Sequence, residues 1–164
     1  MKKELKFVVN GQAYDLWVEP KTVLVQVLRD ELGFKGTKRS CDSGACCACT
    51  VLLDGKAVKS CSILALQANG KEVLTVEGLA NGTQLHPIQQ AFIDNWAFQC
   101  GFCTSGQMMA AKALLDENPD PTREEIRSAM DGHLCRCTGY NMINEAIQDA
   151  AKSLQAQRQQ GGAK

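Results

Sequence analysis

Nine cysteines in 164 residues are the side chains of this sequence with the most chemical potential. The number is odd, and the N-terminus has no apolar core of a secretory signal, so a disulfide framework is a poor explanation. Metal binding or redox chemistry is the better explanation of the cysteines. The cysteines form two groups on either side of the segment 77–83, and each group has enough thiolates for a four-ligand site: Cys41, Cys46, Cys47, Cys49 and Cys61, then Cys100, Cys103, Cys135 and Cys137.

The first group has the spacing of a plant-type two-iron two-sulfur site. Four residues separate Cys41 from Cys46, two separate Cys46 from Cys49, and Cys61 follows after eleven more. The loop DSGACCAC has little side-chain bulk, so backbone N–H groups can approach the sulfurs of a cluster. Zinc prefers two short cysteine pairs and fits this spacing poorly. Three cations precede the loop and can offset negative charge: Lys35, Lys38 and Arg39.

The second group has a less specific spacing. Two residues separate Cys100 from Cys103, one separates Cys135 from Cys137, and 31 residues lie between the two pairs. Zinc therefore stays open as an alternative here. Cys103 is followed by a predicted helix and Cys137 leads into another, and helix N-termini favour thiolates. Two helix starts that converge on one anionic cluster would make a physically sensible site.

The first half of the chain reads as strands around one helix. Alternation predicts a strand over Lys3–Val9, and Asn10-Gly11 predicts a hairpin turn into a return strand at 13–18. A helix follows with Thr22 as its N-cap, and Gly33 ends it. The remaining predicted elements are a hairpin of 50–53 and 56–60 around Asp54-Gly55, a short helix at 63–67 and a strand at 72–76.

The second half reads as helical. Pro87 suits a first helical turn, the segment 104–117 is rich in helix formers, and Thr122 with Glu125 forms a capping box for a helix to about residue 130. A final amphipathic helix spans 140–154. The fold class is therefore α+β. The predicted domains are residues 1–76, a linker at 77–83, a helical domain at 84–155 and a disordered tail at 156–164.

The composition excludes several classes of protein. The chain has 18 basic and 18 acidic side chains, so a nucleic-acid partner has no support. No apolar run approaches the ~20 residues of a membrane span. Without such a span or an export signal, we expect a cytoplasmic protein. The sequence has no phosphate-binding loop and no GxGxxG motif, so we do not expect flavin or nicotinamide binding by the chain itself.

Four segments of the sequence resemble one protein family. They are Cys41-Asp-Ser-Gly-Ala-Cys46-Cys-Ala-Cys49-Thr-Val, Ser60-Cys61, Gln99-Cys100-Gly-Phe-Cys103-Thr and Gly132-His-Leu-Cys135-Arg-Cys137-Thr-Gly-Tyr140. Together they are similar to the small iron-sulfur subunit of the molybdenum hydroxylases, the xanthine dehydrogenase and aldehyde oxidase family. The three-subunit form with a separate small chain is similar to carbon monoxide dehydrogenase and 4-hydroxybenzoyl-CoA reductase. The resemblance covers residues 3–151.

The resemblance implies a ferredoxin-like β-grasp domain and a helical bundle, with one two-iron two-sulfur cluster on each. The ligands it implies for the first cluster, near the FAD of a medium subunit, are Cys41, Cys46, Cys49 and Cys61. The ligands it implies for the second, near the molybdopterin-type molybdenum cofactor of a large subunit, are Cys100, Cys103, Cys135 and Cys137. By the same resemblance Gln99 and Cys137 approach the pterin, and the complex is a dimer of heterotrimers.

The implied function is an electron relay between the molybdenum site and the flavin, with no catalytic residue on this chain. The substrate of the complex, the direction of electron flow and the final acceptor cannot be read from this sequence. Two alternatives stay open: a free ferredoxin-like carrier and a zinc-stapled interaction module. A lone plant-type carrier does not need the helical second domain, which argues against the first of them.

Two residues depart from the family pattern. Cys47 stands where the family usually has Gly, and we expect a tolerated free thiol that lies against the first cluster. Ser105 stands where the family usually has Pro at a helix start, and Ser is a good cap residue. We expect both histidines, His86 and His133, to be structural, because the cysteines already complete two ligand sets.

Overall fold

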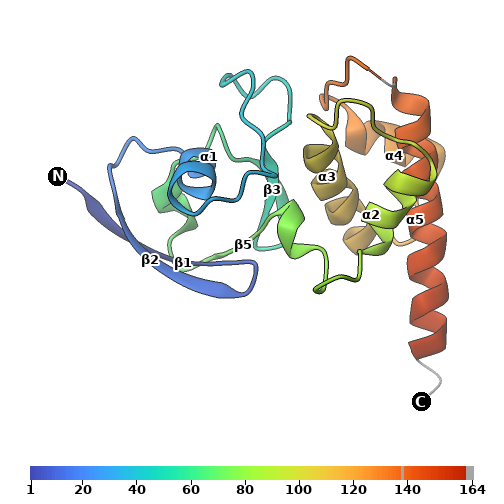
Figure 1. Ribbon diagram of the computed structural model, residues 1–164, viewed down its shortest axis with the longest axis horizontal. Helices are drawn as coiled ribbons and strands as arrows, with labels where there is room; N and C mark the ends of the chain where they lie inside the picture. Colours follow the sequence, from blue (N-terminus) through green and yellow to red (C-terminus); the bar gives the residue numbers. More distant parts are fainter. Residues whose placement is uncertain (138, 162–164) are drawn as a thin grey trace.

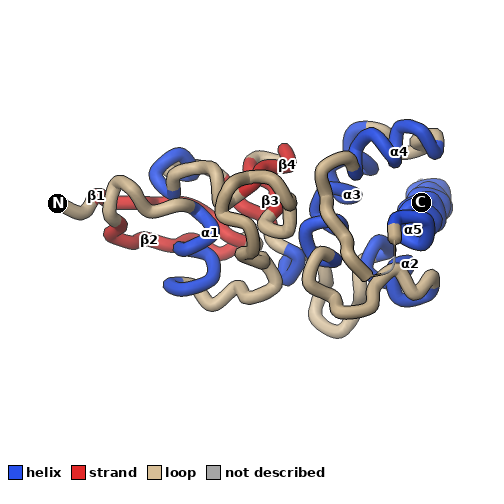
Figure 2. Tube along the Cα trace, turned by 90° about the horizontal axis from the view of Figure 1, so that it is seen from above, coloured by secondary structure: helices blue, strands red, loops and turns tan. Residues whose placement is uncertain are grey.

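A computed structural model describes residues 1–137 and 139–161 of the chain. The chain forms two parts that lie side by side, a sheet with one helix and a bundle of helices (Figure 1). Seen from above, the strands occupy one end of the molecule and helices α2–α5 the other (Figure 2). The α+β fold class is confirmed.

The first part is built on a five-stranded sheet in the order β2-β1-β5-β3-β4. Strands β1 and β5 are parallel, and the other neighbours are antiparallel. Positive φ angles at Asn10 (52°) and Gly11 (79°) confirm the first predicted hairpin, and Asp54 and Gly55 repeat the pattern. The strands are β1 (Lys3–Val9), β2 (Gln12–Val18), β3 (Thr50–Leu53), β4 (Lys56–Lys59) and β5 (Glu72–Leu74).

The helix of the first part begins one residue later than predicted. Its N-cap is Val23, and α1 (Leu24–Gln26) continues into the π-helical turn η1 (Val27–Glu31), which ends before Gly33 at φ +79°. The predicted cap Thr22 is wrong because its carbonyl accepts the Ala65 N–H at 2.8 Å. The predicted short helix at 63–67 is a 3₁₀ turn at Ala65–Ala68.

The second part contains four helices among the described residues: α2 (Pro87–Asp94), α3 (Thr104–Glu117), α4 (Arg123–Met130) and α5 (Tyr140–Gly161). The capping box of Thr122 and Glu125 is confirmed, with the Glu125 N–H donating to the Thr122 hydroxyl at 3.3 Å. The last helix is longer than predicted, because the glutamine-rich segment after residue 154 consists of helix formers. The tail predicted from residue 156 is therefore helical to Gly161, and residues 162–164 lie outside the described residues.

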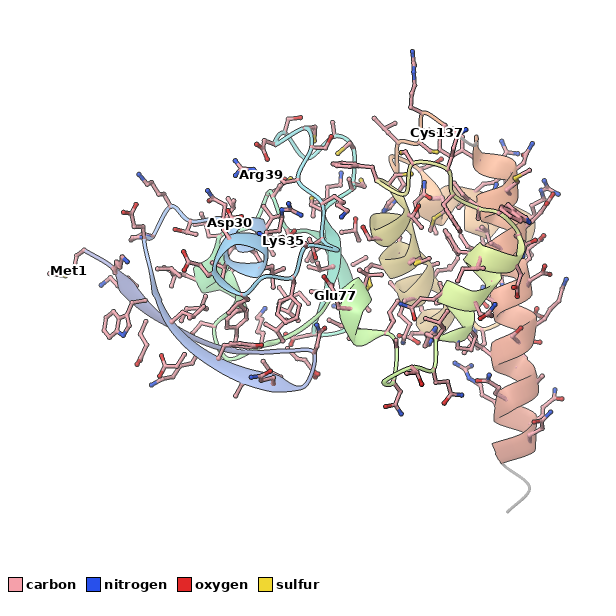
Figure 3. All side chains as sticks on the ribbon, in the orientation of Figure 1. Met1, Asp30, Lys35, Arg39, Glu77 and Cys137 are labelled. Carbon is pink, nitrogen blue, oxygen red and sulfur yellow. The ribbon has the colours of Figure 1, made fainter. Side chains whose placement is uncertain are left out.

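The predicted linker at 77–83 packs against both parts. Glu77 accepts the Gly36 N–H at 2.7 Å and the Thr75 hydroxyl at 2.6 Å, which anchors it to the first part (Figure 3). Leu79 is buried in the core of the helical part, together with Leu52 of β3. The two parts therefore share apolar packing. Along residues 1–137 and 139–161, no helix is long and apolar enough to cross a membrane.

Candidate metal centres

The cysteine-bearing loops of both parts lie at the same end of the molecule (Figure 1). In the first group, the loop between η1 and β3 carries Cys41, Cys46 and Cys49, and the β3–β4 hairpin returns the chain to Cys61. The Ser60 hydroxyl donates to the Cys49 carbonyl at 2.7 Å, which fixes Cys61 beside Cys49. The thiols interact in two pairs, Cys41 with Cys46 and Cys49 with Cys61.

The two pairs of the first group differ in their electrostatic environment. Hydrogen bonds from Ser43 and then Cys46 lower the pKa of the half-buried Cys41 thiol to about 6. Burial raises the pKa of Cys49 to about 11. Because iron binds thiolate, Cys41 is more readily prepared for it than the buried Cys49.

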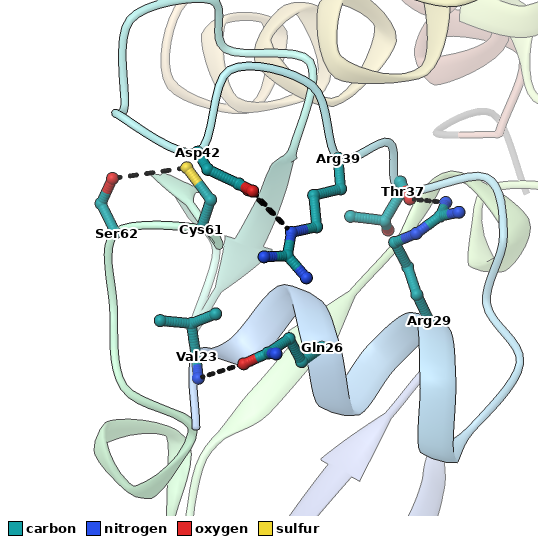
Figure 4. A network of polar contacts seen from close by, with 8 residues as sticks. All are labelled: Val23, Gln26, Arg29, Thr37, Arg39, Asp42, Cys61 and Ser62. Carbon is teal, nitrogen blue, oxygen red and sulfur yellow. Dashed lines mark hydrogen bonds and ion pairs between the residues drawn. The ribbon is translucent and has the colours of Figure 1, made fainter. Parts of the chain in front are cut away.

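The three cations ahead of the first group have partners within the chain. The ammonium groups of Lys35 and Lys38 donate to the carbonyls of Arg29 (2.5 Å) and Lys35 (2.9 Å). Arg39 pairs with Asp42 at 2.7 Å, so its charge is already offset (Figure 4). Both lysines therefore bind backbone carbonyls, and Arg39 interacts with Cys61, whose thiol sits 3.4 Å from the Ser62 hydroxyl.

The second group is assembled from two helix starts, as predicted. Cys103 is the N-cap residue of α3, and Cys137 stands shortly before α5, at the end of the molecule seen at the top of Figure 3. The thiols again form two pairs, Cys100 with Cys137 and Cys103 with Cys135. The Tyr140 hydroxyl accepts the Cys135 N–H at 3.1 Å and so closes the loop in front of α5.

The pKa values of the second group also split by burial. Burial, followed by the hydrogen bond to Cys135, raises the pKa of Cys103 to about 12. The Phe102 N–H and then the Cys137 thiol lower the pKa of the exposed Cys100. The hydrogen bond to Cys100 raises the pKa of Cys137. In each group, burial therefore raises the pKa of one thiol, while hydrogen bonds lower the pKa of another.

Three polar side chains directly after Cys103 are buried and lack partners within the described residues. They are the hydroxyls of Thr104 and Ser105 and both amide atoms of Gln107. An unpaired buried donor is costly, so such a cluster needs an acceptor that the protein chain does not supply. Thr104 is the one of the three that lines the cavity next to Cys103, and sulfur atoms of a cluster there would accept its hydroxyl hydrogen. The expectation that Ser105 caps the helix is wrong, because Cys103 occupies the cap position.

The two cysteine groups face one shared cavity of about 400 Å³. It is lined by Cys41 and Cys46 from the first group and by Cys100, Cys103, Cys135 and Cys137 from the second. The exposed Gln99 also lies on it, as do Phe98, Phe102 and Leu134, which expose unusually large apolar area. Among residues 1–137 and 139–161, no three ligand side chains surround a point where a single metal ion would sit.

The remaining candidate residues lie outside the thiol pairs. His86 is the N-cap of α2, and its Nδ1 accepts the Ile88 N–H at 3.2 Å, so it is structural. His133 is buried, and burial lowers its pKa. Cys47 is also buried and has φ +57°, a conformation that favours Gly. An added Cβ at Gly132 would lie 3.6 Å from the Cys47 sulfur, so this thiol faces the helical part.

Both halves of the chain match known iron-sulfur families. Residues 7–79 match the family described as "2Fe-2S iron-sulfur cluster binding domain", and residues 75–148 match "[2Fe-2S] binding domain". A curated relative is the nicotine 6-hydroxylase small subunit of Paenarthrobacter nicotinovorans. It is 47% identical over 147 residues, which cover 90% of this chain and 88% of the relative.

Solved structures agree with these matches. The chain is similar to one in quinoline 2-oxidoreductase from Pseudomonas putida 86, with a TM-score of 0.91, 44% identity and coverage of 96% and 97% of the two chains. It is also similar to part of the aldehyde oxidoreductase from Desulfovibrio desulfuricans ATCC 27774, with a TM-score of 0.90 and 45% identity. The matched region covers 94% of this chain but 17% of the aldehyde oxidoreductase chain.

Proposed function

Because the chain belongs to the family of small iron-sulfur subunits of the molybdenum hydroxylases, we propose that each of its two cysteine groups holds one two-iron two-sulfur cluster. The chain is the electron-transfer subunit of a molybdenum-dependent oxidoreductase. The free-carrier alternative is wrong, since the relatives are subunits of enzymes. The zinc alternative has no support from the family matches, which are iron-sulfur domains over both halves.

The observation that carries the ligand assignment is the pairing of the thiols. In a cluster with four cysteine ligands, each of the two irons is held by two sulfurs from the protein. The two pairs in each group supply that arrangement. We therefore assign Cys41, Cys46, Cys49 and Cys61 to one cluster and Cys100, Cys103, Cys135 and Cys137 to the other. When bound, the clusters accept and release single electrons.

Exposure supports an order for the two clusters. Cys100 and Cys137 are the exposed cysteines, and Gln99 lies beside them. We propose that this end of the chain faces the molybdopterin cofactor of a large subunit, with Gln99 and Cys137 approaching the pterin. The first cluster then faces the FAD of a medium subunit. The exposed apolar side chains of Phe98, Phe102 and Leu134 support a partner at this end.

Other features of the proposal concern the fold and the assembly. The sheet order with α1 across it supports a ferredoxin-like β-grasp for the first part. We propose domains at 1–76 and from 84 onward, with the second extended from residue 155 to 161 because α5 continues to Gly161. We further propose a cytoplasmic dimer of heterotrimers. The relatives named above act on nicotine, quinoline and an aldehyde at similar identity to this chain. We therefore assign substrate choice to the large subunit.

Two cysteine variants of the purified complex test this function. The wild-type complex should contain about four irons and four acid-labile sulfides per small chain. Cys137→Ser should damage the second cluster and stop electrons from leaving the molybdenum site. Cys46→Ser should damage the first cluster and stop electrons from reaching the flavin. In rapid-mixing spectra of each variant, the molybdenum site or the flavin should respond to its own substrate. The cofactor on the far side of the damaged cluster should not respond. Wild-type transfer in both variants, or stoichiometric zinc without sulfide, would refute the proposal.

A further inference from the structure

One contact between the two cysteine-bearing parts lies next to the cysteines of both, and we call it the junction. Residues 46–50 of the first part form one side of it, and Gly106 with residues 132–134 forms the other. The Leu134 N–H donates to the Cys46 carbonyl at 3.2 Å. The Nε2 atom of His133 lies 3.2 Å from the Thr50 hydroxyl, and both side chains are buried. Each side of the junction is therefore close along the chain to proposed ligands of one cluster.

The hydrogens of the His133 contact can be assigned by counting donors. Thr50 has a single hydroxyl hydrogen, and it donates this hydrogen to the Cys47 carbonyl at 2.7 Å. The imidazole must therefore be the donor to the Thr50 oxygen through its Nε2–H. In the neutral ring this leaves Nδ1 without a hydrogen, and burial lowers the pKa of the ring against the raising effect of the nearby Met130 carbonyl. A directed relay results: His133 donates to Thr50, and Thr50 donates to Cys47.

The junction is also closely packed, so it has little freedom to slide. A Cβ added to Gly106 would lie 2.5 Å from the Cys47 carbonyl oxygen and 3.1 Å from the Ala48 Cα. Gly106 stands in the first turn of α3, three residues after Cys103. The backbone that follows a proposed ligand of the second cluster therefore touches the backbone between two proposed ligands of the first.

We propose that His133 and Thr50 are positioning residues that hold the two clusters at a fixed separation and orientation for electron transfer between them. The pair lies outside both ligand sets, and its geometry joins the loop of one cluster to the loop of the other. A buried hydrogen bond in a low-dielectric site is directional, and losing one partner leaves the other unpaired. Loss of the relay therefore loosens the junction without removing a ligand.

The inference rests on the proposed function, since it needs a cluster on each part. The experiment uses the purified complex with three variants. Thr50→Val removes the hydroxyl at nearly constant shape, and His133→Phe removes the Nε2–H but keeps a ring. Thr50→Ser is the matched control, because it keeps the hydroxyl. The first readout is the magnetic coupling between the two reduced clusters in electron paramagnetic resonance. The second is hydrogen exchange of the Leu134 amide, which does not depend on activity.

Thr50→Val and His133→Phe should each shift or broaden the coupling between the clusters and speed exchange at Leu134. Iron content, the g values of each cluster and their separate midpoint potentials should stay those of the wild type, and Thr50→Ser should match the wild type throughout. Unchanged coupling in both test variants would overturn the proposal. Loss of iron in both would also overturn it, because the pair would then be part of a ligand site. A wild-type complex without two cluster signals would instead refute the proposed function.

Discussion

Gly106→Ala is the substitution that tests most directly whether the two cysteine-bearing parts are held in contact. The added methyl group would lie 2.5 Å from the Cys47 carbonyl oxygen. Close C···O contacts in proteins are ~3.3 Å, so the junction must open by about 0.8 Å or the helix must shift. The obstructing atoms belong to the backbone of residues 47 and 48, which cannot rotate away as a side chain would.

Two effects of opposite sign decide the magnitude of this change. Alanine in place of glycine inside a helix stabilises it by ~1 kcal/mol. Overpacking of a buried contact costs ~1–3 kcal/mol. Because the obstructing atoms are backbone and cannot give way, the cost lies in the upper part of this range, at about 2–3 kcal/mol. After the gain of ~1 kcal/mol in helix propensity, we expect a net local destabilisation of about 1–2 kcal/mol.

Hydrogen–deuterium exchange of the purified complex measures this effect at the right place. The Leu134 amide donates across the junction to Cys46, so its exchange reports opening. A loss of ~1–2 kcal/mol corresponds to about 5–30-fold faster exchange. Ser128→Ala in α4 is the control, because it improves helix propensity at an exposed position and should leave exchange at Leu134 unchanged. Slower or unchanged exchange in Gly106→Ala would refute the close packing of the junction.

Two further substitutions test the two cysteine groups separately. Cys47→Ala should leave iron content and turnover near wild type, because Cys47 is outside the thiol pairs and faces Gly132, whereas Cys46→Ala should lose the first cluster. Iron analysis and spectra of both variants check this. The opposite result would show that the ligand assignment is off by one residue. Tyr140→Phe removes the hydroxyl that accepts the Cys135 N–H, a bond worth ~1 kcal/mol. It should make the second cluster lose iron to a chelator faster than wild type while the first keeps its rate, and equal loss from both clusters would contradict this role for Tyr140.

Local sequence preferences predicted the elements whose geometry is decided locally. Asn10-Gly11 tolerates positive φ angles at both positions, and the hairpin has them. Thr122 and Glu125 form their capping box within four residues of chain. The start of α1 was mispredicted for a different reason. The Leu24 N–H donates to the Ile63 carbonyl at 2.9 Å, so a segment forty residues away decides where that helix begins.

The features of the candidate site likewise divide into those that the sequence predicts and those that depend on the folded structure. Cysteine spacing was sufficient to separate two groups, because ligands of one cluster must lie within a short reach of the chain or at facing helix starts. The pairing of the thiols and the neutralisation of Arg39 by Asp42 depend on side-chain directions in the folded loop. Spacing contains no information about them. The partners of the lysines ahead of the loop could not be predicted either, because nearby carbonyls, which every sequence has, compete for their ammonium groups.

The conformation of Cys47 explains why the junction has no signature in the sequence. Its positive φ turns the loop so that the Cys47 carbonyl accepts both the Thr50 N–H at 3.1 Å and the Thr50 hydroxyl at 2.7 Å. The same turn directs the thiol toward Gly132 and exposes the carbonyl to close approach by Gly106. A left-handed residue is costly for any side chain other than Gly, so the surrounding contacts must hold it in place. Those contacts come from both parts of the chain, from Thr50 in the first and from Gly106 and Gly132 in the second. The strain at Cys47 and the relay from His133 are therefore two aspects of one packed contact, and weakening either should loosen the other.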